Sequence, residues 1–192
     1  KLNHTRIKIG IQGNADSELL MIARVHEYGA TITPKATRNL CIPIHKDSYD
    51  KSPRDFQDLF FIRSRDGYLF GVVAKKGRRD KDNPNILKFL FLLLPSVTIP
   101  ERSFIRAGFD HNKNKLAEIV QNEVARIWQG QQTADGAISW IGGQAVGLIQ
   151  QFMSDASNFE PKGKIQRERY PSYADSPLMV TGRLRNSITW EV

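Results

Sequence analysis

The feature that most constrains the fold is a pair of helix-length apolar patterns separated by a short break. Between Lys115 and Trp128, apolar residues recur every three or four positions, which is typical of a helix with one buried face. The stretch GQQTADG then interrupts the pattern. Gly130 suits a helix end and Thr133 suits the N-cap of a second helix that runs to about Phe152. The sequence therefore predicts two long helices joined by a tight turn.

The second of these helices contains three glycines, Gly142, Gly143 and Gly147. Each should cost roughly 1 kcal/mol relative to alanine in a helix interior. The usual reason to accept this cost is the close approach of another backbone, so we expect such a contact along this helix.

The N-terminal part of the chain reads as a strand followed by a helix. Residues 6–12 alternate between apolar and polar side chains, which predicts a first strand. A helix is expected next, with Asn14 or Asp16 as N-cap and Gly29 just beyond its end. His26 falls in the last turn, where a positive charge is stabilised by the helix dipole. The stretches ATIT and LCIPI are predicted to be short extended segments.

The middle of the chain is expected to be rich in strands. Residues 46–58 are polar and predict a surface excursion, while residues 59–77 predict a hairpin that turns at Asp66–Gly67. The consecutive apolar residues of Ile86–Leu94 predict a strand in a sheet centre or against another chain. Residues 46–98 thus form an insertion-like β region.

Residues 154–176 are polar and contain Pro161, Gly163 and Pro171, which predicts a long mobile arm. A last strand is expected from about Asn186. Together these elements predict an α+β fold in a single domain over residues 1–192, with a mixed, mainly antiparallel sheet packed against two long helices and an extended arm before the C-terminal strand.

The composition is that of a globular protein with one core. The 192 residues are 40% hydrophobic and carry a formal net charge of +8, which favours acidic surfaces, nucleic acid or anionic lipid as partners. The single cysteine, Cys41, allows no internal disulfide and is expected to be a packed thiol. Residues 1–20 lack the apolar stretch of a signal peptide, and Ile86–Pro95 is too short for a membrane-spanning helix, so we expect a soluble protein.

The usual patterns of catalytic and metal sites are weak in this sequence. His26–Glu27 lacks the second histidine, four residues on, of a metalloprotease helix, and His4, His45 and His111 are scattered. The acidic stretch DKDNPN lacks the glycine and final glutamate of a calcium loop, and GIQGN lacks the remainder of a phosphate-binding motif. We therefore expect no enzyme activity, no cofactor and no metal.

Two groups of basic residues are candidates for binding. KKGRRDK is either a solvated loop or a contact for phosphate or an acidic partner, through Lys75, Lys76, Arg78 and Arg79. IPERSFIRAGFD places two arginines around Phe104, which predicts a turn at a helix entrance and also has the composition of an interface.

Three stretches taken together resemble one protein family. ARVHEYGATI resembles its early hEyG segment, IPERSFIRAGFD its PxRxFlr segment, and SPLMVTGRLRNSITWEV its closing PLxxTGxLxxSI segment. The helix–break–helix passage IWQGQQTADGAISWIGGQAV is also similar. The family is the neck and tail-completion proteins of tailed bacteriophages. The resemblance covers residues 19–32, 99–152 and 177–192, and Ser103 stands where the family often has proline.

The resemblance implies an α+β virion subunit without catalytic residues that assembles as a ring, for example of six or twelve copies, at the head–tail junction. It implies contacts with head-closure or connector proteins, with tail-tube or tail-terminator proteins, and non-specifically with phage DNA in the channel, but with no membrane. Assembly would take place in the cytoplasm of the bacterial host. The alternative function is a basic, nucleic-acid-binding accessory protein.

Within this family, HEYG is expected to be a helix end whose Glu27 and Tyr28 face the core or a neighbouring subunit. Charge reversal of Arg102 or Arg106 is expected to block assembly while the subunit still folds. The residues predicted to form the subunit interface are Glu27, Tyr28, Gly29, Arg102, Phe104, Arg106, Gly143, Gly147, Thr181 and Gly182.

Overall fold

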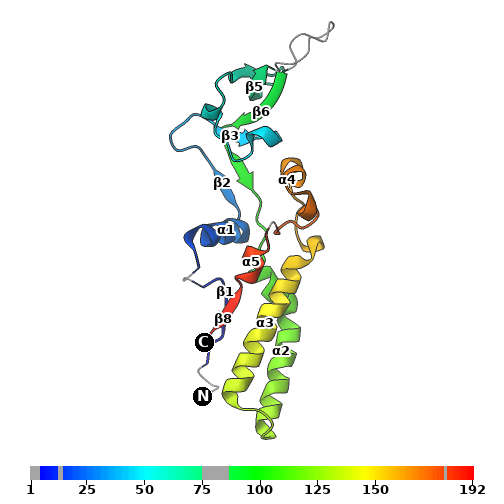
Figure 1. Cartoon of the computed structure of the whole chain (residues 1–192). Coiled ribbons are helices and arrows are strands. Elements are labelled where there is room, and N and C mark those ends of the chain that lie inside the picture. Colours follow the sequence, from blue (N-terminus) through cyan, green and yellow to red (C-terminus); the bar gives the residue numbers. More distant parts are fainter. Residues whose placement is uncertain (1–4, 13–14, 75–86, 180) are drawn as a thin grey trace. The chain divides into compact units, whose positions relative to one another are not determined.

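The structure is a computed structural model that describes residues 5–12, 15–74, 87–179 and 181–192. The chain divides into two compact units, and Figure 1 labels most of their helices and strands. The helical unit consists of Lys1–Ala30 and Ile99–Val192, and the sheet unit consists of Thr31–Thr98. This division differs from the predicted single domain. The predicted insertion-like region, 46–98, lies within a unit that already begins at Thr31.

The α2–α3 pair dominates the helical unit. Helix α2 spans Arg106–Trp128 and packs against α3, which spans Ala134–Ser154. As predicted, Gly130 adopts a left-handed conformation (φ 73°) between them, and the Thr133 hydroxyl accepts a hydrogen bond from Gly136 N at 3.0 Å as the N-cap of α3. Helix α2 begins at Arg106, well before the predicted Lys115, because its first turn is stabilised by contacts with a distant residue.

The remaining elements of the helical unit are short. Helix α1 spans Ser17–Tyr28, with Asp16 as its N-cap and Gly29 just after its end, as predicted. Strand β1 (Lys8–Gly10) pairs antiparallel with β8 (Thr189–Glu191), and both strands contact α3. One turn of helix, α5 (Arg183–Asn186), precedes β8.

The main core of the helical unit joins segments that are far apart in the sequence. Its buried members come from α1, the turn before α2, the end of α3 and the C-terminal segment: Ala23, Phe104, Ile149, Met153, Leu178, Leu184 and Ile188. A second cluster of Leu116, Ala145 and Leu148 lies between the two long helices.

The sheet unit is built on four antiparallel strands in the order β3-β6-β5-β4. Their bounds are Leu40–Pro43 (β3), Phe60–Arg63 (β4), Leu69–Ala74 (β5) and Leu87–Leu94 (β6). The hairpin predicted from the Asp66–Gly67 turn is confirmed as β4–β5, and the apolar run 86–94 is the central strand β6. Strands β2 (Ala30–Ile32) and β7 (Val97–Ile99) pair with each other. The protein is therefore α+β, with its largest sheet in a different unit from its two long helices.

Two predictions for the C-terminal region are wrong. Residues 154–176 are not extended, because they contain α4 (Lys164–Arg169) and single 3-10 turns at Ala156–Asn158 and Pro171–Tyr173. The last strand begins at Thr189, not at about Asn186, because Gly182 (φ 77°) turns the chain into the single turn of α5.

The three glycines of α3 have different surroundings. Gly142 lies against the indole ring of Trp190, which leaves no room for a Cβ atom, so a side chain and not a backbone approaches it. At Gly143 and Gly147, both exposed, a Cβ atom would meet no described atom within 4 Å. Of these three glycines, packing against the described residues requires only Gly142.

We predict opposite effects of alanine at these positions. Gly143→Ala and Gly147→Ala should each raise the free energy of unfolding by about 0.5–1 kcal/mol, because alanine loses less backbone entropy in a helix. Gly142→Ala should lower it by roughly 1–3 kcal/mol, because the new methyl group displaces the Trp190 ring. Urea denaturation of the three variants measures these differences. Equal changes at all three positions would contradict the packing described.

Candidate functional site

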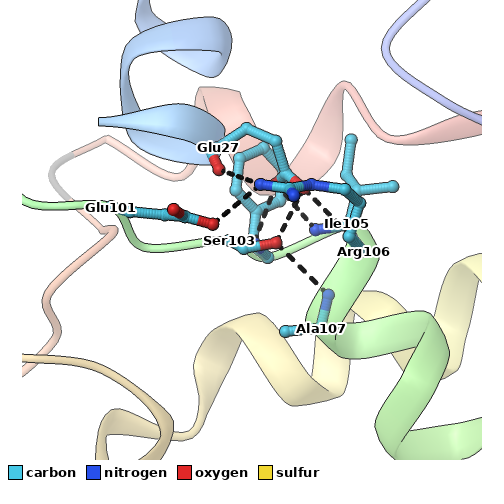
Figure 2. A network of polar contacts seen from close by, with 7 residues as sticks. Glu27, Glu101, Ser103, Ile105, Arg106 and Ala107 are labelled. Atoms are coloured by element: carbon cyan, nitrogen blue, oxygen red, sulfur yellow. Dashed lines mark hydrogen bonds and ion pairs between the residues drawn. The ribbon is translucent and has the colours of Figure 1, made fainter. Parts of the chain in front are cut away.

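The most densely connected polar site joins the end of α1 to the start of α2. Glu27, whose residue exposure is 5%, accepts five hydrogen bonds with its carboxylate (Figure 2). Oε1 accepts from Ser103 Oγ at 2.8 Å and from the N and Nε of Arg106 at 3.0 Å each. Oε2 accepts from the backbone N–H groups of Phe104 at 2.9 Å and Ile105 at 3.0 Å. We call this group of contacts the Glu27 cap.

The Glu27 cap supplies hydrogen-bond acceptors for the first N–H groups of α2, which the N-cap residue next to the helix start does not provide. The first N–H groups of a helix have no partners within the helix, and Ile105 at the N-cap position offers no side-chain acceptor. A carboxylate at this end also interacts favourably with the helix dipole. Ser103 Oγ accepts a further bond from Ala107 N at 3.3 Å, so the hydroxyl links Glu27 to the first turn. A side chain more than 70 positions away thus caps α2.

The Glu27 cap keeps the carboxylate charged. Burial by itself raises the pKa of Glu27, but the N–H groups of Ile105 and Arg106, the Ser103 hydroxyl and the Phe104 N–H together outweigh it and lower the pKa below its ordinary value of 4.5. The hydrogen bond to Glu27 raises the pKa of Arg106. Because both oxygens are occupied by these donors, Glu27 is poorly placed to act as a general base.

Arg106 and Gly29 complete the contacts around HEYG. Arg106 Nη2 donates to the backbone oxygen of Glu27 at 2.7 Å and to Glu101 Oε1 at 2.8 Å, and its guanidinium lies 4.6 Å from the centre of the Tyr28 ring. Gly29 has φ 68°, and a Cβ atom there would lie 3.0 Å from Glu101 N and 3.1 Å from Ile99 O. Glycine is therefore required at position 29 both by its conformation and by the close approach of the chain.

A second set of contacts ties the segment 160–179 to the site. Arg102, 8% exposed, donates from Nε to Glu160 O at 3.0 Å and from Nη2 to Pro161 O at 3.2 Å. Lys162, 4% exposed, donates from Nζ to Tyr173 O at 2.9 Å and to Met179 O at 2.5 Å. Burial lowers the pKa of both side chains, and the proximity of Arg102 lowers that of Lys162 further.

His26 behaves differently from the prediction. Its backbone oxygen accepts from Arg102 N at 2.7 Å, while its Nδ1 is buried and has no hydrogen-bond partner in the described part of the chain. Burial lowers the pKa of His26, and the positive charges of Arg102 and Lys162 lower it further. This environment favours the neutral imidazole and so opposes the positive charge that the helix dipole would stabilise at this position.

The predicted interface residues fall into three groups. The side chains of Glu27, Arg102 and Phe104 are buried by contacts within this chain, and Phe104 belongs to the core. The second group reaches the surface and consists of Tyr28 (62% exposed), Arg106, Gly143, Gly147 and Thr181. The third group, Gly29 and Gly182, is partly buried, and both glycines have positive φ angles. The basic residues Lys75, Lys76, Arg78 and Arg79 lie outside the described residues.

The contacts of Arg102 and Arg106 lead to a different prediction for their charge reversal. A glutamate at position 102 would replace two donors to backbone carbonyl oxygens by a buried acceptor, and a glutamate at 106 would face the Glu27 carboxylate. Both changes would therefore destabilise the subunit itself and cannot separate assembly from folding.

Comparison with known proteins gives no relative: no family model, no curated protein and no solved structure matches this chain. None of the helices in the described part of the chain has the length and apolarity needed to cross a membrane. Across residues 5–12, 15–74, 87–179 and 181–192, no three His, Cys, Asp or Glu side chains are arranged to hold a metal ion.

We predict that Glu27→Gln lowers the free energy of unfolding by about 2–4 kcal/mol. The glutamine side chain has nearly the same volume as glutamate, but it lacks the buried charge that pairs with Arg106. Its NH₂ group is itself a donor and would face the donors that now bind the carboxylate. Urea denaturation measures the effect. Glu101→Gln is the matched control: its carboxylate also binds Arg106 but is exposed, so it should change stability by less than about 1 kcal/mol. Equal effects of the two variants would contradict the Glu27 cap.

The pH dependence follows from the lowered pKa of Glu27. A carboxyl group whose pKa is lower in the folded state contributes stability that is fully present above its unfolded value and is lost as the pH falls through the folded value. The difference in stability between wild type and Glu27→Gln should therefore be constant above about pH 5.5 and should shrink progressively below pH 4.5, the ordinary value of this group. Denaturant titrations of both proteins across this range test the sign. A difference that grew on acidification would contradict it.

Proposed function

We propose that this chain is a structural subunit of the neck or tail end of a tailed-bacteriophage particle, where copies assemble as a ring. The observation that carries the proposal is the convergence of the three stretches that resemble this family. Glu27 of the first stretch caps the helix opened by the second, and Leu178, Leu184 and Ile188 of the third share a core with Phe104. Stretches that belong to one conserved fold are expected to form one structural unit of this kind.

The surface of α3 supports assembly with other chains. Trp140 is 51% exposed, and Gly143 and Gly147 follow it at spacings of three and four residues, which places all three on one face of the helix. The exposed Trp140 ring and the two glycines beside it form a surface that a helix or loop of a neighbouring chain can approach closely. Among the residues that the structure describes, no contact requires glycine at either position.

The Glu27 cap supports a role without catalysis. The histidine–glutamate pair is the most enzyme-like feature of the sequence, but the Glu27 carboxylate is occupied by five donors. These contacts fix the junction of α1 and α2. We therefore infer that HEYG maintains the shape of the subunit.

We predict that the double variant Gly143→Gln, Gly147→Gln folds but does not assemble. Glutamine is a good helix former and finds open space at both positions, so the stability of the subunit should be equal to or higher than that of wild type. In a ring, two added side chains would separate the packed surfaces. Sedimentation of the tagged protein from its native source, after nuclease treatment and at high salt, should show wild type in a large particle and the variant as a small species.

Ala125→Gln, an exposed position on α2, is the matched control and should co-sediment with the particle. If wild type itself sedimented only as a small species, the virion role would be wrong. If the double variant co-sedimented with the particle, the face of α3 would not be the interface, although the virion role would stand.

A further inference from the structure

A groove with two arginines and a tyrosine crosses one end of the four-stranded sheet. Its volume is about 410 Å³, within the range of small-ligand sites. Arg38, Arg63 and Tyr68 provide its functional groups. The other lining residues are Asn39, Gly67, Leu69, Leu93, Leu94 and Pro95. All of these residues belong to the sheet unit.

The β4–β5 turn holds the groove in a fixed geometry. Ser64 N donates to Tyr68 O at 2.8 Å, Tyr68 N donates to Ser64 Oγ at 3.1 Å, and Gly67 has φ 86°. Arg63 Nη1 donates to Gly67 O at 2.8 Å, which fixes the guanidinium beside the turn. The side of the groove that the β4–β5 turn forms is therefore largely pre-formed, so little ordering of that side is needed on binding.

The tyrosine ring is available as a stacking surface. Tyr68 is 54% exposed although it belongs to a rigid turn. Exposed aromatic rings next to guanidinium groups are the combination that binds unpaired bases and their phosphates.

The charge of the chain is concentrated in the same unit. Residues 31–98 contain 13 Lys and Arg against 7 Asp and Glu, whereas the rest of the chain contains 15 against 13. The sheet unit thus carries +6 of the total of +8. Within the described residues, no carboxylate forms an ion pair with Arg38 or Arg63. Both guanidinium groups are therefore free of carboxylate partners there, in a unit of positive charge.

From these observations we propose that the groove binds single-stranded nucleic acid, with a base stacked on Tyr68 and adjacent phosphates held by Arg38 and Arg63. The partner is single-stranded because a duplex keeps its bases stacked and offers the ring no free face. Sequence readout is not implied, because aromatic stacking accepts any base. The binding surface belongs to the sheet unit and goes beyond the proposed structural role, which rests on the helical unit.

The test is fluorescence anisotropy of the full chain with a labelled oligothymidylate of about 20 nucleotides, and with a duplex of the same length. Single strands should bind more tightly than the duplex, and affinity should fall steeply between about 50 and 200 mM salt. Tyr68→Ala should weaken single-strand binding by roughly 5- to 100-fold, while Tyr68→Phe, which keeps the ring, should bind within about 2-fold of wild type.

Charge reversal tests the arginines. Arg38→Glu, Arg63→Glu should weaken binding by more than about 10-fold and flatten the salt dependence, because about two phosphate contacts are lost. The control Arg24→Glu, Lys115→Glu makes the same change in net charge on exposed residues of the helical unit and should bind nearly as wild type does. Circular dichroism verifies that each variant is folded.

The proposal would be overturned by no binding to the single strand, by a Tyr68→Ala variant that binds as tightly as wild type, or by equal effects of the two double variants. Tight duplex binding that is insensitive to Tyr68 would indicate non-specific charge contact and would also overturn it. None of these results bears on whether the chain co-sediments with a particle, so the proposed function would still be tested separately.

Discussion

The fold of the helical unit depends on a buried carboxylate that receives five hydrogen bonds. A buried ionised glutamate is costly unless every lone pair finds a donor, and the start of a helix is one of the few places where a protein backbone offers several donors together. Glu27 and the first turn of α2 therefore satisfy each other's requirements. The same contact fixes the direction in which α2 leaves the turn, and hence the position of α3 and of the core that α3 shares with α1 and the C-terminal segment.

The sequence allowed good prediction of elements that are defined by local patterns. The α2–α3 break, the caps of α1 and α3 and the β4–β5 hairpin are each specified by a few neighbouring residues, Gly130, Thr133, Asp16 and Gly67 among them. The start of α2 was not predictable in this way, because its cap comes from Glu27 and its first buried apolar residue, Leu116, lies ten positions into the helix. The division into two units was missed because the stretch around Thr31 shows no change in composition.

The residues of the candidate site were found more easily than their roles. HEYG and PERSFIR each lie in a stretch that resembles one protein family, but the spacing of the two stretches does not predict that they are in direct contact. Ser103 illustrates the difference: it stood out only as a departure from a family pattern, whereas its hydroxyl bridges Glu27 and Ala107 N. No sequence pattern predicted the burial of Lys162, because a lysine in a polar, proline-containing segment is expected to be solvated. Its burial depends on the carbonyl groups of Tyr173 and Met179, which only the folded chain brings to it.

The close approach at Gly29 has a consequence for how such a chain can change over time. The chain leaves the helical unit just after Gly29 and re-enters it at Ile99. These two points approach each other so closely that a Cβ atom at Gly29 would lie 3.0 Å from Glu101 N and 3.1 Å from Ile99 O. An excursion whose two ends are already adjacent can be shortened, lengthened or exchanged at little cost in loop-closure entropy, because that entropy grows only slowly with the number of residues enclosed. The residues between Ala30 and Ile99 thus occupy a position at which a module of different size or binding preference can replace the present one, while the capped helix pair continues to fold around the same carboxylate.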